Sequence, residues 1–227
     1  MVSSYDVVIP AFNAGKTLSA AVQSVLAQHI LPSKIIIIDD GSKDDTATIA
    51  TSLNGPIEVR RQDNQGPGAA TTAGFALCDA PFIATLDADD IWLPHKIEQQ
   101  FAQFAQHPAL AASFCKLANF YTDPSEADFT NARGGWSRST MLIKHEAVNA
   151  IGPIVDPIGR AGEMIDWFAR GLEQGHQMLV MDEALALRRI HKDSLTYQHQ
   201  DLATSYLHVA RAALMRRRAA KQGSDPR

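Results

Sequence analysis

Short apolar runs alternate with helix-spaced apolar positions along the first hundred residues. Strand-like runs occupy residues 6–10, 34–39, 57–61 and 82–86, and helical patterns occupy 16–29, 46–53 and 68–77. Strands that alternate with helices are typical of βαβ units. The sequence therefore predicts an α/β fold with a Rossmann-like, mostly parallel sheet and helices on both faces.

One of these strands carries four consecutive isoleucines, residues 35–38. Successive side chains of a strand point to opposite faces of the sheet, so both faces of this strand must be covered. We therefore expect residues 34–39 to be the central strand.

The second half of the chain has a more mixed pattern. Strands are predicted at residues 111–119, 137–143, 177–181 and 185–190, and helices at 94–106, 163–174 and 201–221. The polar stretch 121–135 is expected to be a loop. The last helix ends in three arginines and is followed by a polar tail.

Composition narrows the class of protein. The chain has 227 residues, of which 45% are hydrophobic, and a net charge of −4. This charge argues against nucleic acid as a partner. The two cysteines, Cys78 and Cys115, are expected to be buried thiols rather than a disulfide. The N-terminus has no signal-peptide pattern, and no apolar run approaches the roughly 18 residues that cross a bilayer. We expect a cytoplasmic location.

An acidic run follows the strand at residues 82–86. In extended backbone, Asp87 and Asp89 would face one ligand and Asp90 would face away. Carboxylate oxygens favour Mg²⁺ or Mn²⁺, which often also bind substrate phosphates. The alternative is a solvated acidic turn.

Other polar residues follow the remaining strands. Ligands of open α/β sheets bind beyond the carboxyl ends of the strands. Phe12 could stack on a base, and an acidic residue at 39 or 40 could accept a hydrogen bond from the imide N–H of uracil or thymine. The glycine-rich turn at residues 66–68 allows close approach of the backbone. Together these features predict a nucleotide pocket that ends at a metal.

Four segments in order, residues 8–13, 38–44, 64–70 and 86–90, resemble the nucleotide-binding half of family-two inverting glycosyltransferases with the GT-A fold. The resemblance covers residues 5–195 and is strongest in the first 100. It implies one GT-A-like domain, 1–200, with a nucleotide-binding half (1–106) and a mixed acceptor half (107–200), before the C-terminal helix and basic tail (201–227).

The resemblance also implies ligands and roles. The donor would be a nucleotide-sugar, often a UDP-sugar, and the acceptor a saccharide or a lipid-linked molecule. Mn²⁺ or Mg²⁺ would be held on the diphosphate by Asp89, with Asp87 assisting. Asp40 would bind the base. The complete set of implied donor-site residues is Pro10, Phe12, Asn13, Asp39, Asp40, Gly66, Asp87 and His191.

The catalytic base is expected at the start of the helix at 163–174. Family members commonly show Gly-Glu-Asp there, but this chain has Met164 in place of the aspartate. Glu163 is our first candidate, because a helix N-terminus favours a carboxylate. Asp166 is the second, although it is also placed to pair with Arg170 four residues on.

Residues 188–194 resemble the family's Arg-x-His-x-x-Ser segment. This resemblance would place His191 near the diphosphate or as a metal ligand; the alternative is a structural histidine. The basic helix at the C-terminus could make a weak peripheral contact with anionic lipid on the inner face of the membrane.

The mechanism implied by the resemblance is a single displacement that inverts the anomeric carbon, with metal assistance to the leaving diphosphate. Two alternatives stay open. Met164 is compatible with a nucleotide-sugar-binding module that has lost turnover. Asp-x-Asp after a strand also occurs in aspartyl-phosphate phosphohydrolases, although there it follows the first strand.

Overall fold

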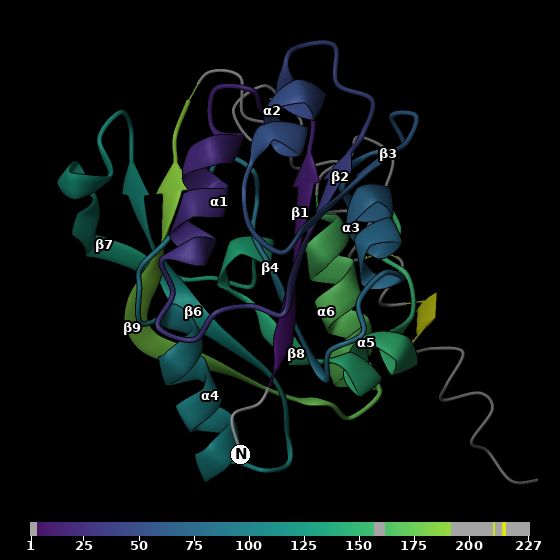
Figure 1. Cartoon of the computed structure of the whole chain (residues 1–227). Helices are drawn as coiled ribbons and strands as arrows, with labels where there is room; N and C mark the ends of the chain where they lie inside the picture. The colour runs from purple at the N-terminus through teal and green to yellow at the C-terminus, as the bar shows by residue number, and fades with distance from the viewer. Residues whose placement is uncertain (1–3, 157–161, 192–210, 212–214, 217–227) are drawn as a thin grey trace, which may run out of the picture.

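The computed structural model describes residues 4–156, 162–191, 211 and 215–216 (Figure 1). The strands are β1 Tyr5–Ala11, β2 Lys34–Asp39, β3 Ile57–Arg61, β4 Phe82–Thr85, β5 Ile91–Trp92, β6 Leu110–Phe120, β7 Asp128–Gly134, β8 Leu142–Lys144 and β9 Gln177–Arg189. The helices are α1 Leu18–Leu26, α2 Thr46–Ser52, α3 Pro67–Phe75, α4 Lys96–Gln106, α5 His145–Ile151 and α6 Glu163–Glu173, with 3₁₀ turns η1 Pro124–Glu126 and η2 Arg138–Thr140.

These strands form one mixed sheet. Their order is β3-β2-β1-β4-β8-β6-β9-β5, and β7 pairs with β6 outside this path. The first four strands are parallel, whereas β8 runs antiparallel to both β4 and β6. The α/β fold is therefore confirmed, with parallel pairing concentrated in the first half of the chain and mixed pairing in the second.

Helices cover both faces of the sheet (Figure 1). On one face, α1, α2 and α4 pack on side chains that include Val7, Ile9 and Ile35. On the other, α3, α5 and α6 pack on side chains that include Val8 and Ile36. Successive side chains of each strand thus point to opposite faces of the sheet and pack into two separate hydrophobic cores.

The isoleucines of β2 are buried on both faces, with at most 1% of each side chain exposed. The strand is nevertheless not central, because it lies second from the β3 edge of the sheet. The prediction of position was wrong because two-sided burial requires helices above and below a strand, not several strands on either side of it.

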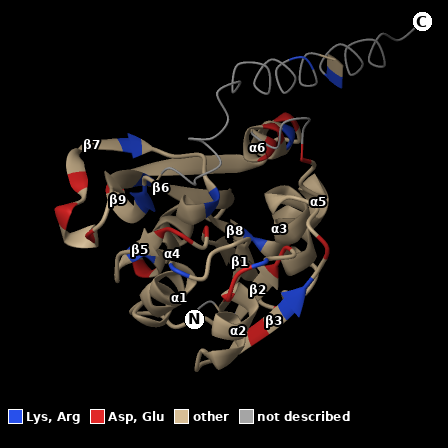
Figure 2. Ribbon diagram, turned by 90° about the horizontal axis from the view of Figure 1, so that it is seen from above, with Lys and Arg blue, Asp and Glu red and all other residues tan. Residues whose placement is uncertain are grey.

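The stretch 121–135 is not simply a loop, since it contains η1 and β7. Strand β7 is exposed over most of its length and pairs with β6 through its backbone, so it shows no apolar alternation. It forms the arm at the left of Figure 2, where acidic and basic residues lie close together.

The predicted strand at 137–143 was wrong in its first part. Residues 138–140 form η2, and only Leu142–Lys144 is a strand. Within this segment the Thr140 hydroxyl donates to Gly135 O and Ser137 O, bonds that compete with a sheet ladder. The strands predicted at 177–181 and 185–190 are one continuous strand, β9, whose pairing with β6 shifts register.

Two remaining predictions concern the end of the chain and membranes. Except for residues 211, 215 and 216, the C-terminal helix predicted at 201–221 lies outside the described residues. Within the described part of the chain, no helix has the length and apolar character needed to cross a bilayer.

Candidate functional site

The carboxyl ends of β1, β2, β3 and β4 lie along one edge of the sheet, because these neighbouring strands are parallel. The loops after them carry the residues that the sequence singled out. Topology therefore brings together the segments that follow Ala11, Asp39, Arg61 and Thr85.

The loop after β1 offers an aromatic surface. Phe12 is 48% exposed, whereas Pro10 is buried within β1. Asn13 adopts a positive φ of 50°. Its amide N–H donates to Ser42 Oγ at 2.9 Å, and its Oδ1 accepts from the Lys43 amide at 2.9 Å. Asn13 thus ties this loop to the loop after β2, and Phe12 is the residue available for stacking.

The two aspartates after β2 organise neighbouring loops. Asp39 is fully buried, and its Oδ1 accepts from the Ser42 amide at 3.0 Å while Oδ2 lies 3.4 Å from Arg61 Nε. Asp40 Oδ1 accepts from Gln62 Nε2 and the Gln65 amide, and Oδ2 accepts from the Gly66 amide at 2.9 Å. A carboxylate has about four lone-pair sites, so three of those of Asp40 are occupied. Asp40 is also only 3% exposed, and its role toward a base stays a prediction.

The acidic turn after β4 differs from the expected extended backbone. The strand ends at Thr85, and the Asp90 amide donates back to Asp87 O at 3.1 Å. Asp89 Oδ2 lies 2.9 Å from His191 Nε2, whereas Asp87 Oδ1 accepts from Arg138 Nε at 2.6 Å. The two carboxylates therefore have different partners, one on each side of the turn.

Asp90 is buried. It is 4% exposed, and it accepts from Ser139 Oγ at 2.5 Å and from the Arg189 amide at 3.1 Å. Burial, together with the charges of Asp89 and Asp87, raises the pKa of Asp90 well above its ordinary value. Burial and the charge of Asp87 also raise the pKa of Asp89, and the bond to His191 opposes this rise.

Arg138 is the main residue that the sequence analysis missed. Its Nε pairs with Asp87 Oδ1 and its Nη1 with Glu163 Oε1, both at 2.6 Å. The side chain is only 11% exposed. Burial acts to lower the pKa of Arg138, but the charges of Asp87 and Glu163 raise it above its ordinary value. Arg138 thus joins the acidic turn to the start of α6.

Glu163 and Asp166 lie one turn apart on α6 but have different partners. Glu163 is the first residue of the helix, follows Gly162 at φ 87°, and is 7% exposed. Asp166 pairs with Arg170 Nε at 3.3 Å, as its spacing predicted, and with Arg216 Nη1 at 2.8 Å. Only Glu163 therefore shares a partner with the acidic turn.

A second residue outside the predicted set, Asp156, follows α5 in the sequence and contacts the start of α3. Its two carboxylate oxygens accept from the amides of Gly68 at 3.0 Å and Ala69 at 2.9 Å. Gly66 leaves room for this carboxylate, since a Cβ at Gly66 would lie 2.9 Å from Asp156 Oδ2. Gly66 therefore approaches a protein carboxylate in this structure, and its role toward a nucleotide stays a prediction.

The structure brings together only part of the set proposed to hold Mn²⁺ or Mg²⁺. Asp89 Oδ2 lies 2.9 Å from His191 Nε2, whereas Asp87 Oδ1 faces Arg138, and among the described residues these three do not form a close group of ligand atoms. Asp87 and Asp89 have side chains that are 28% and 30% exposed, and His191 is 32% exposed. Carboxylate oxygens suit both ions, and an added imidazole favours Mn²⁺ over Mg²⁺. Burial, and after it the charges of the neighbouring aspartates, raise the pKa of Asp89 and Asp90.

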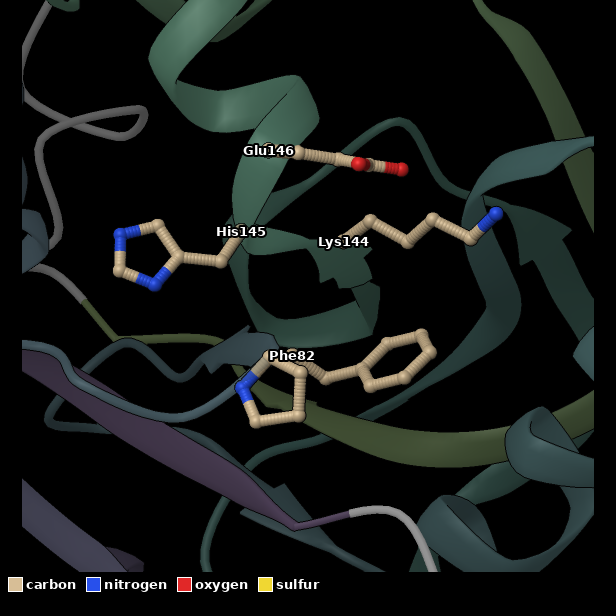
Figure 3. Close-up of a pocket in the computed structure, with 5 residues that line it drawn as sticks. Phe82, Lys144, His145 and Glu146 are labelled. Carbon is tan, nitrogen blue, oxygen red and sulfur yellow. The ribbon is translucent and has the colours of Figure 1, made fainter.

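A separate hollow lies beyond the amino end of β4, at the end of the sheet opposite the candidate site (Figure 3). It is lined by Pro81, Phe82, Lys144, His145 and Glu146, where β4 begins and β8 ends. Phe82, Lys144 and Glu146 extend to one side and His145 to the other (Figure 3). Because Asp87 follows the other end of β4, this hollow is not part of the candidate site.

The parallel strands, the mixed second half of the sheet and the helices on both faces define the class of fold, which is that of GT-A glycosyltransferases. Solved structures agree. TarS 1–349 of S. aureus in complex with UDP-GlcNAc has a TM-score of 0.75 at 16% identity, covering 92% of this chain and 65% of that one. The complex of TarS 1–349 with UDP has a TM-score of 0.68 at 17% identity, covering 83% of this chain and 61% of that one.

Sequence comparison identifies the family. The profile of Glycosyl transferase family 2 matches residues 6–153, and the chain belongs to this family. Succinoglycan biosynthesis protein ExoU of Rhizobium meliloti is 26% identical in an alignment 235 positions long that covers 92% of this chain and 68% of ExoU. An uncharacterized glycosyltransferase of Nostoc sp. is 42% identical over 98 residues, which cover 41% of this chain and 30% of that protein. The chain thus spans only part of the length of these relatives.

Proposed function

We propose that this protein transfers a sugar from a nucleoside-diphosphate sugar, with UDP-sugars as first candidates, to an acceptor hydroxyl with inversion at the anomeric carbon. The observation that carries the proposal is the Arg138 bridge, which joins Asp87 to Glu163 through two contacts of 2.6 Å. Family membership supports transfer, and the complexes of TarS with UDP and UDP-GlcNAc support a uridine nucleotide.

The donor is proposed to lie across the carboxyl edge of the parallel strands. Phe12 would stack on the base, and Asp40 would accept its imide N–H. Asp89, His191 and Asp87 would hold Mn²⁺ or Mg²⁺ near the diphosphate. When bound, the cation would neutralise charge that builds on the departing diphosphate.

Glu163 is proposed to act as the general base. Its Oε1 is paired with Arg138, so Oε2 would take the proton from the acceptor hydroxyl. The acceptor oxygen forms its bond to the anomeric carbon while the bond from that carbon to the diphosphate oxygen breaks. Attack from the face opposite the leaving group inverts the configuration. Arg138 would hold Glu163 in place through the contact between Nη1 and Oε1.

The acceptor is proposed to be a saccharide or a lipid-linked saccharide. The similarity to a protein of succinoglycan biosynthesis supports a saccharide. A cytoplasmic location and weak contact of the basic C-terminal segment with the inner face of a membrane stay part of this proposal.

A second candidate function is a nucleotide-sugar-binding module without turnover. Met164, at the position where many members of the family place an aspartate, is 6% exposed and belongs to the apolar cluster with Trp167 and Phe168. This position therefore supplies no base. If Glu163 does not serve, the site would bind a donor and leave it intact.

The test is to incubate the chain with UDP-, GDP- and dTDP-sugars and saccharide acceptors, with and without Mn²⁺, and to measure release of nucleoside diphosphate. Transfer that gives a product of inverted anomeric configuration, detected by NMR, supports the proposal. Donor binding without release supports the binding module. Release of phosphate from simple phosphate esters, with no release of nucleoside diphosphate, would indicate a phosphohydrolase instead.

A further inference from the structure

Two histidines and a glutamate meet on the surface away from the candidate donor site. His29 lies in the turn after α1, His95 immediately precedes α4, and Glu98 lies in the first turn of α4. Glu98 Oε2 is 3.2 Å from His29 Nδ1 and 3.5 Å from His95 Nδ1. One ligand atom from each residue lies within 4.8 Å of the other two.

The chemistry of this group favours a transition metal. Two imidazole nitrogens and one carboxylate oxygen form a donor set found at zinc sites, whereas Mg²⁺ and Ca²⁺ prefer oxygen ligands. The two rings are in edge contact, with centroids 4.1 Å apart. Both Nδ1 atoms face the same carboxylate oxygen, so small rotations would direct all three donors at one ion.

The backbone beneath these side chains is held in place by direct hydrogen bonds. The His29 amide donates to Pro94 O at 3.1 Å. Gln28, which is 4% exposed, donates from Nε2 to Leu93 O at 2.8 Å and accepts from the Ile97 amide at 3.2 Å. The end of α1 and the start of α4 are thus fixed before any ion binds, which lowers the cost of ordering the ligands.

The group is accessible and separate from the acidic turn. The side chains of His29, His95 and Glu98 are 48%, 55% and 55% exposed, which leaves room for a water as fourth ligand. Tyr5, the first residue of β1, donates from its hydroxyl to Ile30 O at 2.7 Å. The group therefore lies near the amino ends of the parallel strands, whereas Asp87 and Asp89 follow their carboxyl ends.

We infer that His29, His95 and Glu98 form a surface zinc site that links the end of α1 to the start of α4. The site takes one Zn²⁺, with two imidazole nitrogens and one carboxylate oxygen from the protein. It does not depend on the function proposed above.

The test is calorimetric titration of the untagged full chain with Zn²⁺. Asp89→Ala is the background, because it removes the cation ligand at the other edge of the sheet. In this background we expect one Zn²⁺ per chain, and His29→Ala and His95→Ala should each weaken binding at least about tenfold. His107→Ala, which removes an exposed histidine at the other end of α4, is the matched control and should bind Zn²⁺ with unchanged affinity.

Two further readouts need no enzymatic activity. Zn²⁺ should raise the Tm of the Asp89→Ala chain, because an ion that binds only the folded state stabilises it, and this rise should be absent in the added His29→Ala variant. Co²⁺ should give visible absorption bands typical of four-coordinate cobalt, and these should be lost with His95→Ala. Zn²⁺ binding that is absent from the Asp89→Ala chain, or unchanged by both histidine substitutions, would overturn the inference.

Discussion

The parallel and mixed halves of the sheet contribute to the candidate site in different ways. In the parallel half, Phe12, Asp40 and Asp89 follow strand ends that the topology already aligns. In the mixed half, residues reach the same place from a 3₁₀ turn, a helix start and a strand end. Arg138 bonds Asp87 across 51 residues of sequence, and His191 contacts Asp89 across 102.

This difference separates two tasks. The parallel half would bind the donor, because its loops converge whatever their side chains. The mixed half would position the reacting groups through individual ion pairs. Each of these pairs depends on one particular side chain. Substitutions in the mixed half should therefore reduce turnover more than nucleotide binding, and the following predictions test that separation.

Asp89→Ala should have the largest effect on transfer, a loss of at least about 10³-fold, because it removes the principal proposed ligand of the cation. Asp87→Ala should cost less, since Arg138 already neutralises Asp87. Initial rates at several Mn²⁺ concentrations compare the two variants. Equal losses would contradict the proposed ranking of the two aspartates.

Glu163→Gln should reduce transfer at least about 10²-fold while leaving UDP affinity nearly unchanged, because the amide cannot take a proton. Asp166→Asn is the matched control on the same helix. It should retain more activity than Glu163→Gln, since Asp166 pairs with Arg170 and Arg216, whereas Glu163 pairs with the arginine that also holds Asp87. If Asp166→Asn proves the more damaging variant in a kcat measurement, Glu163 is not the base.

Lys96 should make stability depend on pH. It is fully buried in α4, where its Nζ donates to Gln100 Oε1 at 2.8 Å and lies over the ring of Trp92. Burial lowers the pKa of Lys96 to about 8. The unfolded chain therefore binds more protons between pH 8 and about 10.4, so this residue makes stability rise with pH in that window.

Urea unfolding of the wild type and Lys96→Met at several pH values measures this effect. Relative to the variant, the wild type should gain about 3 kcal/mol in free energy of unfolding from pH 7 to pH 10.5. The difference between the two proteins removes contributions from other titrating groups. A difference that does not change with pH would show that Lys96 has no lowered pKa in the folded state.

Arg138→Lys should lower kcat on the order of tenfold and change the KM for the donor little, because one ammonium cannot bridge Asp87 and Glu163 with the geometry of a guanidinium. Arg133→Lys, on the exposed strand β7, is a control that should leave kcat unchanged. A rise in the KM for the donor with an unchanged kcat would argue that Arg138 acts on donor binding instead.

Asp156→Asn should have the smallest effect, a loss of about 1 kcal/mol in free energy of unfolding. The carboxylate accepts from two amides at the start of α3, and an asparagine side chain offers only one acceptor oxygen. Urea unfolding measures the change. A variant as stable as the wild type would show that this contact does not stabilise the helix.

Much of the parallel half could be predicted from the sequence. The bounds of β2 and β3 agree with the structure, because each strand is a compact run between turn residues. The convergence of the loops followed from parallel pairing alone. Contacts rather than exposure distinguish two neighbours in the first of these loops: Phe12 and Asn13 are both exposed, but Asn13 bonds the adjacent loop.

The mixed half was less predictable for a physical reason. Ser137 to Thr140 have no apolar period, so nothing local indicated that Arg138 would meet Asp87 and Glu163. Strand β7 is exposed and therefore has no buried face that would give its sequence an alternation of apolar and polar residues. Glu163 and Asp166 could be proposed from their place on a helix, but their partners depend on contacts between distant segments.

The most direct test of the account is calorimetric titration of UDP, with and without Mn²⁺, into the wild type and Asp89→Ala. The account predicts that Mn²⁺ strengthens UDP binding to the wild type at least about tenfold and that Asp89→Ala loses this gain. If UDP binds both proteins equally with and without Mn²⁺, the acidic turn is not the diphosphate site. The proposal that residues of the parallel and mixed halves together bind the donor would then be wrong.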